Sequence, residues 1–325
     1  MNRQADLFGD LPAPVPAAPA HSAADGDPEM KRLASLLPHA IRLGTSSWAF
    51  PGWAGTVYDR TLPERLLARE GLAAYALHPL LRTVGIDRSF YAPLPEADFR
   101  RYAEQVPETF RFLVKAPQAL TSDYLFETRE ASPHFLDPRA ARYLFVDPCV
   151  AGLGTQAGPL VFQFPPLRRG FTRERRGDFA SRLARFLCGL PRGPLYAVEF
   201  RDRELLAAEI VQALAPSGTR LCLSIHARMP PVQVQAAAAT ALGPGPLIVR
   251  WNLHAGFAYE EAKARYAPFD KLVDEDPATR MAIARLCREC AASGSEAWVI
   301  ANNKAEGSAP LTLARLASAI VDGGQ

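Results

Sequence analysis

The strongest constraint on the fold is a short stretch, Leu195-Tyr-Ala-Val-Glu-Phe-Arg201, in which mostly apolar residues lead directly into two charges. Such a run is typical of a strand that is buried on both faces and carries polar residues at its carboxyl end. Burying either charge without a partner would be costly. Because strand side chains alternate, we expect Glu199 and Arg201 at an open strand end, on the same side of the strand.

The same pattern, an apolar run that ends in polar residues, occurs eight times. Amphipathic helices are expected between the runs, and such alternation implies parallel strands with right-handed crossovers. Eight units indicate an α/β fold with a single closed (β/α)8 barrel of the TIM type. The alternative is a doubly wound open sheet, but no G-x-G-x-x-G sequence follows any strand. The runs are Leu43–Ser46, Val84–Asp87, Phe112–Lys115, Leu160–Gln163, Leu195–Arg201, Leu221–Ser224, Leu247–Arg250 and Trp298–Asn303.

Helices are expected to begin at Pro63-Glu64 and Pro95-Glu96, where proline suits the first turn. Two connections that follow strands are unusually long, namely 115–160 and 250–277, and are candidate lids over the carboxyl-end face. The first contains two more helix starts, Asp137-Pro138 and Asp147-Pro148. Further helices are expected near residues 172–190, 203–215, 231–242, 277–292 and 308–321.

Residues 1–38 are rich in Ala, Pro, Asp and Ser, so we expect a disordered tail before a barrel that spans 39–325. Within the tail, Gln4-Ala-Asp-Leu7-Phe8 resembles the bacterial sliding-clamp binding pentapeptide, in which a glutamine and two apolar residues dock into pockets on the clamp. Gln4, Leu7 and Phe8 are therefore candidate partner-binding residues. The alternatives are a chance match and a local turn that folds back on the domain.

The composition gives no sign of a strongly charged partner or of a membrane segment. With 37 basic and 34 acidic residues the formal charge is only +3, so no strong field for nucleic acid or membranes follows, and direct nucleic-acid binding stays open. No apolar run is long enough to span a bilayer, and no secretory signal is visible, which indicates a cytoplasmic protein with reduced cysteines. Cys287 and Cys290 lack the second pair of a structural zinc site and fit one apolar helix face.

If the barrel closes, the polar residues at the strand ends meet at one mouth. These cations, amides and hydroxyls suit an anionic or highly hydroxylated small molecule. Glu199 is the candidate general acid or base, with Lys115 and Asp87 as further catalytic candidates. The alternative is that charges such as Glu199 and Arg250 merely pair with one another. The candidate ligand-binding residues are Ser46, Trp48, Ser89, Tyr91, Gln163, Arg201, Arg250, His254, Asn302 and Asn303.

A metal site is the less favoured interpretation, and no cofactor can be named from the sequence. No H-x-H or H-E-x-x-H spacing is present. If a divalent ion is bound at the mouth, its ligands are expected to be Asp87, Glu199, His226 and His254.

Several motifs in one order give the chain a resemblance to a known family. They include Gly44-Thr-Ser-Ser-Trp48, Ser89-Phe-Tyr91, Gln163-Phe-Pro-Pro166, Glu199-Phe-Arg201 and Asn302-Asn303. From Ile41 to about Ala319 the sequence resembles the YecE-like family, the domain of unknown function 72. The resemblance implies an eight-stranded TIM-type barrel and a family whose activity is not established.

The chain also departs from the pattern of that family. The family usually has Val-Glu-x-Asn in the second strand, where this chain reads Val84-Gly-Ile-Asp87, so the acidic side chain has moved by two residues. The sixth strand usually ends in Asp, and Ser224 and His226 stand there instead. These changes indicate a divergent branch with a different ligand or a partly dismantled site.

Three functions fit these observations. The leading one is an enzyme of the hydrolase or lyase type, because no dinucleotide fingerprint supports redox chemistry. The second is a metal-dependent DNA-repair nuclease or clamp-associated factor, by analogy with abasic-site endonucleases that share the barrel. The third is a non-catalytic adaptor that holds a ligand in the barrel while its tail recruits it to the clamp.

Overall fold

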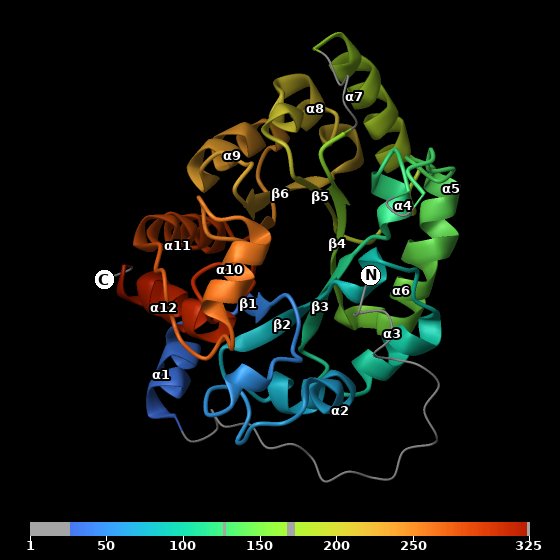
Figure 1. Cartoon of the computed structure of the whole chain (residues 1–325). Coiled ribbons are helices and arrows are strands. Elements are labelled where there is room, and N and C mark those ends of the chain that lie inside the picture. Colours follow the sequence, from blue (N-terminus) through green and yellow to red (C-terminus); the bar gives the residue numbers. More distant parts are fainter. Residues whose placement is uncertain (1–26, 126–127, 168–172, 324–325) are drawn as a thin grey trace.

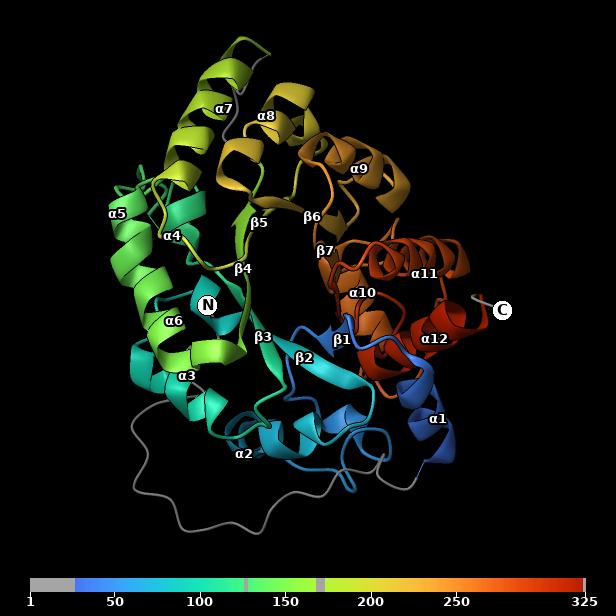
Figure 2. The same ribbon diagram turned by 180° about the vertical axis from the view of Figure 1, so that it is seen from behind.

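Eight parallel strands close into one barrel, and helices surround it (Figures 1 and 2). The structure is a computed structural model that describes residues 27–125, 128–167 and 173–323. Each strand pairs with its neighbours in the chain, and β1 pairs with β8 to close the ring. The predicted TIM-type barrel is confirmed. Its strands are β1 (Ile41–Thr45), β2 (Leu81–Ile86), β3 (Arg111–Lys115), β4 (Ala157–Phe164), β5 (Tyr196–Phe200), β6 (Arg220–Ile225), β7 (Leu247–Trp251) and β8 (Ala297–Ala301).

The interior of the barrel has two layers. Seven buried residues form an apolar cluster that is separate from the main core between strands and helices, namely Leu113, Val161, Ala197, Cys222, Ile248, Trp298 and Ile300. Alternation along a strand points every second side chain the same way, so the residues two positions further on also face inward. Those residues are polar, and they form the upper layer at the carboxyl ends: Lys115, Gln163, Glu199, Ser224, Arg250 and Asn302.

The outer helices largely follow the prediction. The expected helix at 203–215 is broken into a one-turn helix, Arg203–Leu206, and a short α8, while α10 forms inside a connection that we expected to be a lid. Of the two expected starts in the connection 115–160, Asp137-Pro138 begins a helix, but Asp147-Pro148 does not, because a π-helical segment over residues 142–146 joins α5 to α6 without a break. The helices are α1 (Pro28–Leu36), α2 (Glu64–Ala76), α3 (Glu96–Ala103), α4 (Gln118–Thr121), α5 (Pro138–Ala141), α6 (Asp147–Leu153), α7 (Arg173–Cys188), α8 (Ala208–Gln212), α9 (Val232–Ala239), α10 (Tyr259–Tyr266), α11 (Pro277–Ala292) and α12 (Ala309–Asp322).

The expected disordered tail is too long at its carboxyl end. Residues 28–36 form α1, which packs beside α12 in both views (Figures 1 and 2). Asp27 caps the helix by accepting hydrogen bonds from the backbone N–H groups of Glu29 and Met30, and Pro28 occupies its first turn. Leu33 and Leu37 are buried. The Ala- and Pro-rich composition of the preceding residues obscured this capping signal.

The two long connections predicted as lids, 115–160 and 250–277, pack against different parts of the barrel. The segment between β3 and β4 supplies α6, which packs on α3 in the outer layer, so this helix is a crossover helix and not a lid. The segment between β7 and α11 carries α10 and contributes aromatic rings near the mouth.

Three sequence predictions touch on other parts of the chain. No helix in the described ranges is long and apolar enough to cross a membrane.

Cys287 and Cys290 are both free thiols on α11, where Cys287 is buried. The clamp-like residues Gln4, Leu7 and Phe8 lie outside the described residues.

Candidate active site at the barrel mouth

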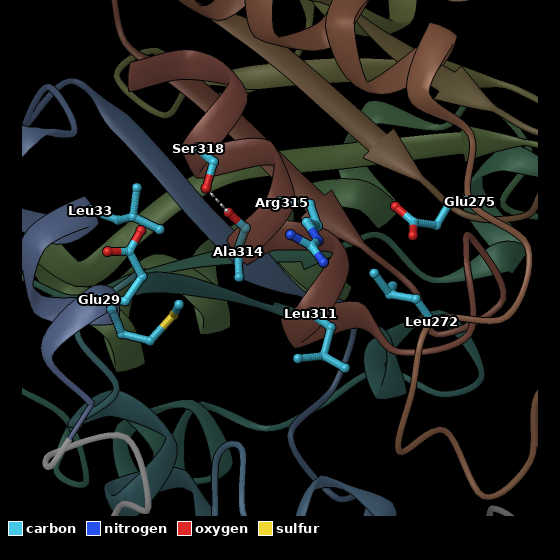
Figure 3. Close-up of a pocket in the computed structure, with 9 residues that line it drawn as sticks. Glu29, Leu33, Leu272, Glu275, Leu311, Ala314, Arg315 and Ser318 are labelled. Carbon is cyan, nitrogen blue, oxygen red and sulfur yellow. Dashed lines mark hydrogen bonds between the residues drawn. The ribbon is translucent and has the colours of Figure 1, made fainter. Parts of the chain in front are cut away.

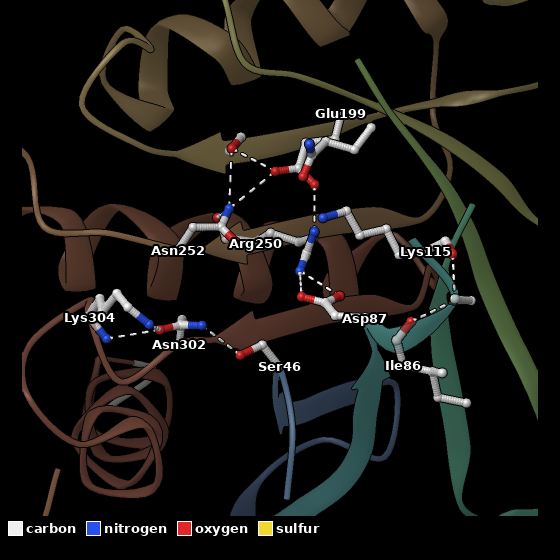
Figure 4. A network of polar contacts seen from close by, with 12 residues as sticks. Ser46, Ile86, Asp87, Lys115, Glu199, Arg250, Asn252, Asn302 and Lys304 are labelled. Carbon is white, nitrogen blue, oxygen red and sulfur yellow. Dashed lines mark hydrogen bonds and ion pairs between the residues drawn. The ribbon is translucent and has the colours of Figure 1, made fainter. Parts of the chain in front are cut away.

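Arg250 connects two carboxylates that come from other strands (Figure 4). Its Nη1 donates to Oε2 of Glu199 at 2.8 Å, and its Nη2 donates to both carboxylate oxygens of Asp87, at 2.9 and 2.7 Å. β7 positions Arg250, β5 positions Glu199, and Asp87 follows β2. Burial opposes the charge on Arg250, but the two carboxylates outweigh it and raise the pKa of the guanidinium. Arg250 therefore forms ion pairs with Glu199 and Asp87, as the alternative interpretation of these charges predicted.

Glu199 is fully buried and surrounded by donors. Arg201 Nε lies 2.7 Å from Oε1 as an ion pair, without the alignment of a hydrogen bond. Ser224 Oγ and Asn252 Nδ2 donate to the same oxygen at 2.9 and 3.2 Å. Burial raises the pKa of the carboxyl group, but Arg201, Arg250 and Lys115 outweigh it and lower the pKa to about 2. Such a carboxylate is a poor proton acceptor at neutral pH.

Lys115 differs from the charges of the Asp87–Arg250–Glu199 network because no carboxylate pairs with it. The residue is 7% exposed, and Figure 4 shows its side chain pointing toward that network. No hydrogen bond or ion pair joins its Nζ to any described residue; instead Nζ lies 3.6 Å from the centre of the Phe90 ring. Burial, together with the nearby Arg250 and Arg201 charges, lowers the pKa of the amine to about 7, against the opposing effect of Asp87.

Gln163 and Arg201 extend the network along the mouth. Arg201 Nη2 donates to Oε1 of Gln163 at 3.1 Å, and Gln163 pairs with Glu199 in the register of β4 and β5. Arg201 is half-buried, and burial lowers its pKa. One face of its guanidinium is thus fixed by Glu199 and Gln163.

A second polar group lies where β8 and β1 end. Asn302 Nδ2 donates to Ser46 Oγ at 2.8 Å, and Lys304 Nζ donates to Asn302 Oδ1 at 3.3 Å (Figure 4). Lys304 Nζ also lies 4.3 Å from the centre of the Tyr259 ring on α10. Burial lowers the pKa of Lys304 to about 8. This group adds a second buried ammonium to the mouth.

Three predicted ligand-binding residues are occupied by structural contacts. Asn303 points away from the interior, and its Oδ1 accepts hydrogen bonds from Trp53 Nε1 and from the backbone of Ala309 at the start of α12. Ser89 is buried, and its hydroxyl lies within hydrogen-bonding distance of the carbonyl oxygens of Lys115 and Ile86. Trp48 is buried edge-on against Tyr102.

The remaining predicted residues lie at the rim. Tyr91 is 51% exposed, and its ring contacts that of Phe90 edge-on. His254 Nδ1 lies 2.7 Å from the carbonyl oxygen of Ala255, and its ring packs on Phe257. Burial and the Arg201 charge lower the pKa of His226 to about 4, so this side chain is neutral at physiological pH.

The four conditional metal ligands do not assemble into a site. Across the described ranges, no group of three or more His, Cys, Asp or Glu side chains is close enough to hold a metal ion. Asp87 and Glu199 direct their oxygens at Arg250 instead. The donor set therefore does not fit a divalent ion.

Asn252, at the end of the seventh predicted strand, belongs to the site, as expected for a polar residue at a strand end. Ser224, Lys304 and Phe90 also belong to it, but they were not among the candidate site residues predicted from the sequence. Ser224 lies on the inward side of its strand, so alternation alone could have identified it. Lys304 follows Asn302 by two residues and is one of only five lysines in the chain. No feature of the sequence pointed to Phe90 as a residue of the site.

The described chain also has a cleft of about 410 Å³ outside the barrel (Figure 3). It lies between α1 and α12 and is lined by apolar residues such as Leu33 and Leu311, with Glu29 and Arg315 among the polar ones. None of the predicted site residues lines it, so the mouth remains the candidate site.

Comparisons with known proteins identify the family. The family model described as "Protein of unknown function DUF72" matches residues 42–324. The chain belongs to the DUF72 family. The UPF0759 protein YunF of Bacillus subtilis (strain 168) is 29% identical over 119 residues, which are 35% of this chain and 38% of YunF. The match thus spans well under half of that curated relative.

Solved structures of DUF72 proteins share the fold. One from Enterococcus faecalis V583 has a TM-score of 0.59 at 17% identity and covers 86% of this chain and 95% of its own. One from Thermotoga maritima MSB8 has a TM-score of 0.56 at 19% identity, with coverage of 85% and 97%. The UV damage endonuclease SacUVDE has a TM-score of 0.50 at 10% identity, with coverage of 87% and 99%. At these identities the likeness shows the fold alone.

The end of the second strand leaves space for only one of two neighbouring side chains in this DUF72 protein. Gly85 leaves little room for a side chain, since a Cβ there would lie 3.2 Å from the Cα of Ser46. Asp87, which follows the strand, reaches Arg250. The carboxylate of Asp87 therefore takes part in the ion-pair network.

Proposed function

We propose that this DUF72 protein is an enzyme of the lyase or hydrolase type that acts on a polar, anionic small molecule at the barrel mouth. The observation that carries the proposal is Lys115, a buried amine without a carboxylate partner, which lies beside the paired charges of Asp87, Arg250 and Glu199. Buried lysines in structural roles are almost always paired. A desolvated amine with a pKa near 7 is suited to proton transfer or nucleophilic attack.

The rest of the mouth supports an anionic ligand. Arg201, Arg250 and Lys304 contribute three cations to the inner network, and Asp87 and Glu199 contribute two carboxylates. This balance leaves net positive charge even when Lys115 is neutral. Glu199 positions Arg201 and Arg250, while Asn302 and Gln163 offer amides that can orient hydroxyl or carbonyl groups of a ligand.

The nuclease alternative has weaker support. Metal-dependent cleavage needs several ligands around one ion, and the described residues offer no such group. The adaptor alternative predicts retention of a ligand without its conversion, so one experiment separates it from an enzyme.

The test is incubation of purified full-length protein with a small-molecule extract from bacterial cells, followed by mass spectrometry. The comparison variants are Lys115→Met and, as a matched control, Lys271→Met at an exposed position. We expect wild type and the control to deplete the same compound, and Lys115→Met to leave it unchanged. Retention of a compound without depletion would favour the adaptor, and neither effect with wild type would overturn the proposal.

A further inference from the structure

Lysine is rare in this chain, and its placement is uneven. The sequence has 37 basic residues, of which only Lys31, Lys115, Lys263, Lys271 and Lys304 are lysines, so arginine supplies nearly all of the positive charge. Lys31, Lys263 and Lys271 are exposed, whereas Lys115 and Lys304 are buried at the mouth. Arginine cannot lose its proton in proteins, while a buried lysine can. Lysine thus occupies the two buried positions of the mouth at which a neutral amine could act.

The backbone holds Lys115 in a fixed position. It is the last residue of β3, and the next backbone N–H, that of Ala116, donates to the carbonyl oxygen of Val161 on β4. Its own carbonyl oxygen lies 2.6 Å from Ser89 Oγ. The side chain extends from this anchored strand end into the mouth, where the ring of Phe90 faces Nζ at 3.6 Å.

The acceptors near Lys115 are already engaged. Both oxygens of Asp87 accept from Arg250, and both oxygens of Glu199 accept from Arg250, Ser224 or Asn252. Within the described residues, neither carboxylate forms a hydrogen bond or an ion pair with Lys115. Burial is the main cause that lowers the pKa of the amine, and the charges of Arg250 and Arg201 add to it, against the opposing effect of Asp87 and Glu199. Its lone pair is available for a reaction.

We propose that Lys115 is a covalent nucleophile that forms a Schiff base with an aldehyde or ketone substrate. This inference rests on the proposed function and names its substrate class. The amine nitrogen attacks the carbonyl carbon, and a proton passes from nitrogen to oxygen to give a carbinolamine. A proton taken up from solvent then converts the hydroxyl group of the carbinolamine into water, and its departure leaves an iminium ion. The iminium withdraws electrons from the adjacent carbon, which is the chemistry that a lyase needs.

The experiment is reductive trapping of the full-length protein. Purified protein is incubated at pH 7 with pyruvate, glycolaldehyde or glyceraldehyde 3-phosphate, reduced with sodium borohydride, and digested for peptide mass spectrometry. Borohydride delivers hydride to the iminium carbon and leaves a stable secondary amine. The chain has only five lysines, so peptide mass spectrometry can measure the labelling of each lysine separately.

The expected result is preferential labelling of Lys115. At pH 7 a lysine with a pKa of about 7 is roughly half neutral, whereas an ordinary lysine is neutral in fewer than about one molecule in a thousand. We therefore expect labelling of Lys115 to exceed that of Lys31, Lys263 and Lys271 by at least about tenfold. The adduct should be absent from Lys115→Arg and preserved in Lys271→Arg.

The other outcomes separate this inference from the proposed function. Labelling spread evenly over the exposed lysines, or no adduct at Lys115 with any of the three probes, overturns the Schiff base. If, in addition, Lys115→Met still abolishes depletion of a metabolite, the amine acts by proton transfer and the proposed function stands. The primary measurement uses wild-type protein, so a variant that folds poorly does not affect it.

Discussion

Arg250 Nη1 and Glu199 Oε2 lie 2.8 Å apart in an ion pair whose two side chains are at most 1% exposed. Removing one partner from such a pair leaves an uncompensated buried charge, which is more costly than the pair itself is favourable. The first predictions follow from this asymmetry.

Arg250→Met should destabilise the fold by about 3–5 kcal/mol, because Glu199 and Asp87 both lose their shared cation. Urea unfolding of the variant and wild type measures the change. The matched control is Arg285→Met, which breaks an exposed pair with Glu289 and should change stability by less than about 0.5 kcal/mol. Equal effects of the two substitutions would contradict the buried network.

Glu199 should make the protein sensitive to acid. Its pKa in the folded state, about 2, lies below the unfolded value of 4.5, so its contribution is complete above about pH 5 and is lost as the pH falls toward 2. Glu199→Gln should lower stability at pH 7 and reduce the loss that wild type shows between pH 5 and 2. Urea midpoints at several pH values test this. Parallel pH profiles for the variant and wild type would show that another group is responsible.

Lys115 should affect the pH dependence in a different, more alkaline range. The pKa of its amine is about 7 in the folded state, against the ordinary value of 10.5 expected in the unfolded state. Between pH 7 and 10.5 the protein therefore takes up a proton when it unfolds, so its free energy of unfolding rises with pH across that range. Lys115→Met should therefore gain more stability, relative to wild type, at pH 6 than at pH 10. Lys271→Met, at an exposed position, provides the baseline. A gain that does not vary with pH would mean that Lys115 keeps an ordinary pKa.

Asn302 and Asn303 should behave differently although they are neighbours. Asn303→Ala leaves Trp53 Nε1 and the Ala309 N–H without their acceptor, and should cost about 1–3 kcal/mol of stability. Asn302→Ala removes contacts to Ser46 and Lys304 in the mouth, and should weaken turnover or ligand retention more than folding. Thermal unfolding and metabolite depletion, measured on both variants, separate the two roles. The reverse pattern would assign Asn303 to the ligand.

Recruitment to the sliding clamp stays a proposal that concerns the tail. Phe8→Ala should abolish binding of the full-length protein to a purified bacterial clamp in a surface-binding assay, while thermal unfolding of the barrel is unchanged. Val15→Ala, in the same tail, is the control and should bind as wild type does. If Phe8→Ala binds equally well, the pentapeptide resemblance is accidental.

The sequence predicted the barrel and its polar end because both depend on local patterns. Apolar runs that end in charge locate the strands, and closure brings their ends together. Asn302 directly follows β8 and lies two residues after the inward-facing Ile300, so alternation could also have predicted its direction, whereas Asn303 lies in the turn beyond the strand. Local sequence patterns do not predict which charged side chains pair with each other across the barrel interior. Arg250 binds Asp87 from a strand that is not its neighbour, and this contact exists only once the ring has closed.

The contact of Arg250 with both Asp87 and Glu199 has a consequence for motion at the mouth. The three residues come from the ends of β7, β2 and β5, which are not adjacent in the ring, so the pairs cross the interior instead of following the sheet. Fraying of any one of these strand ends would separate buried charges from their partners. We therefore expect the carboxyl ends of β2, β5 and β7 to open together, and their backbone amides to exchange hydrogen with solvent at similar, slow rates.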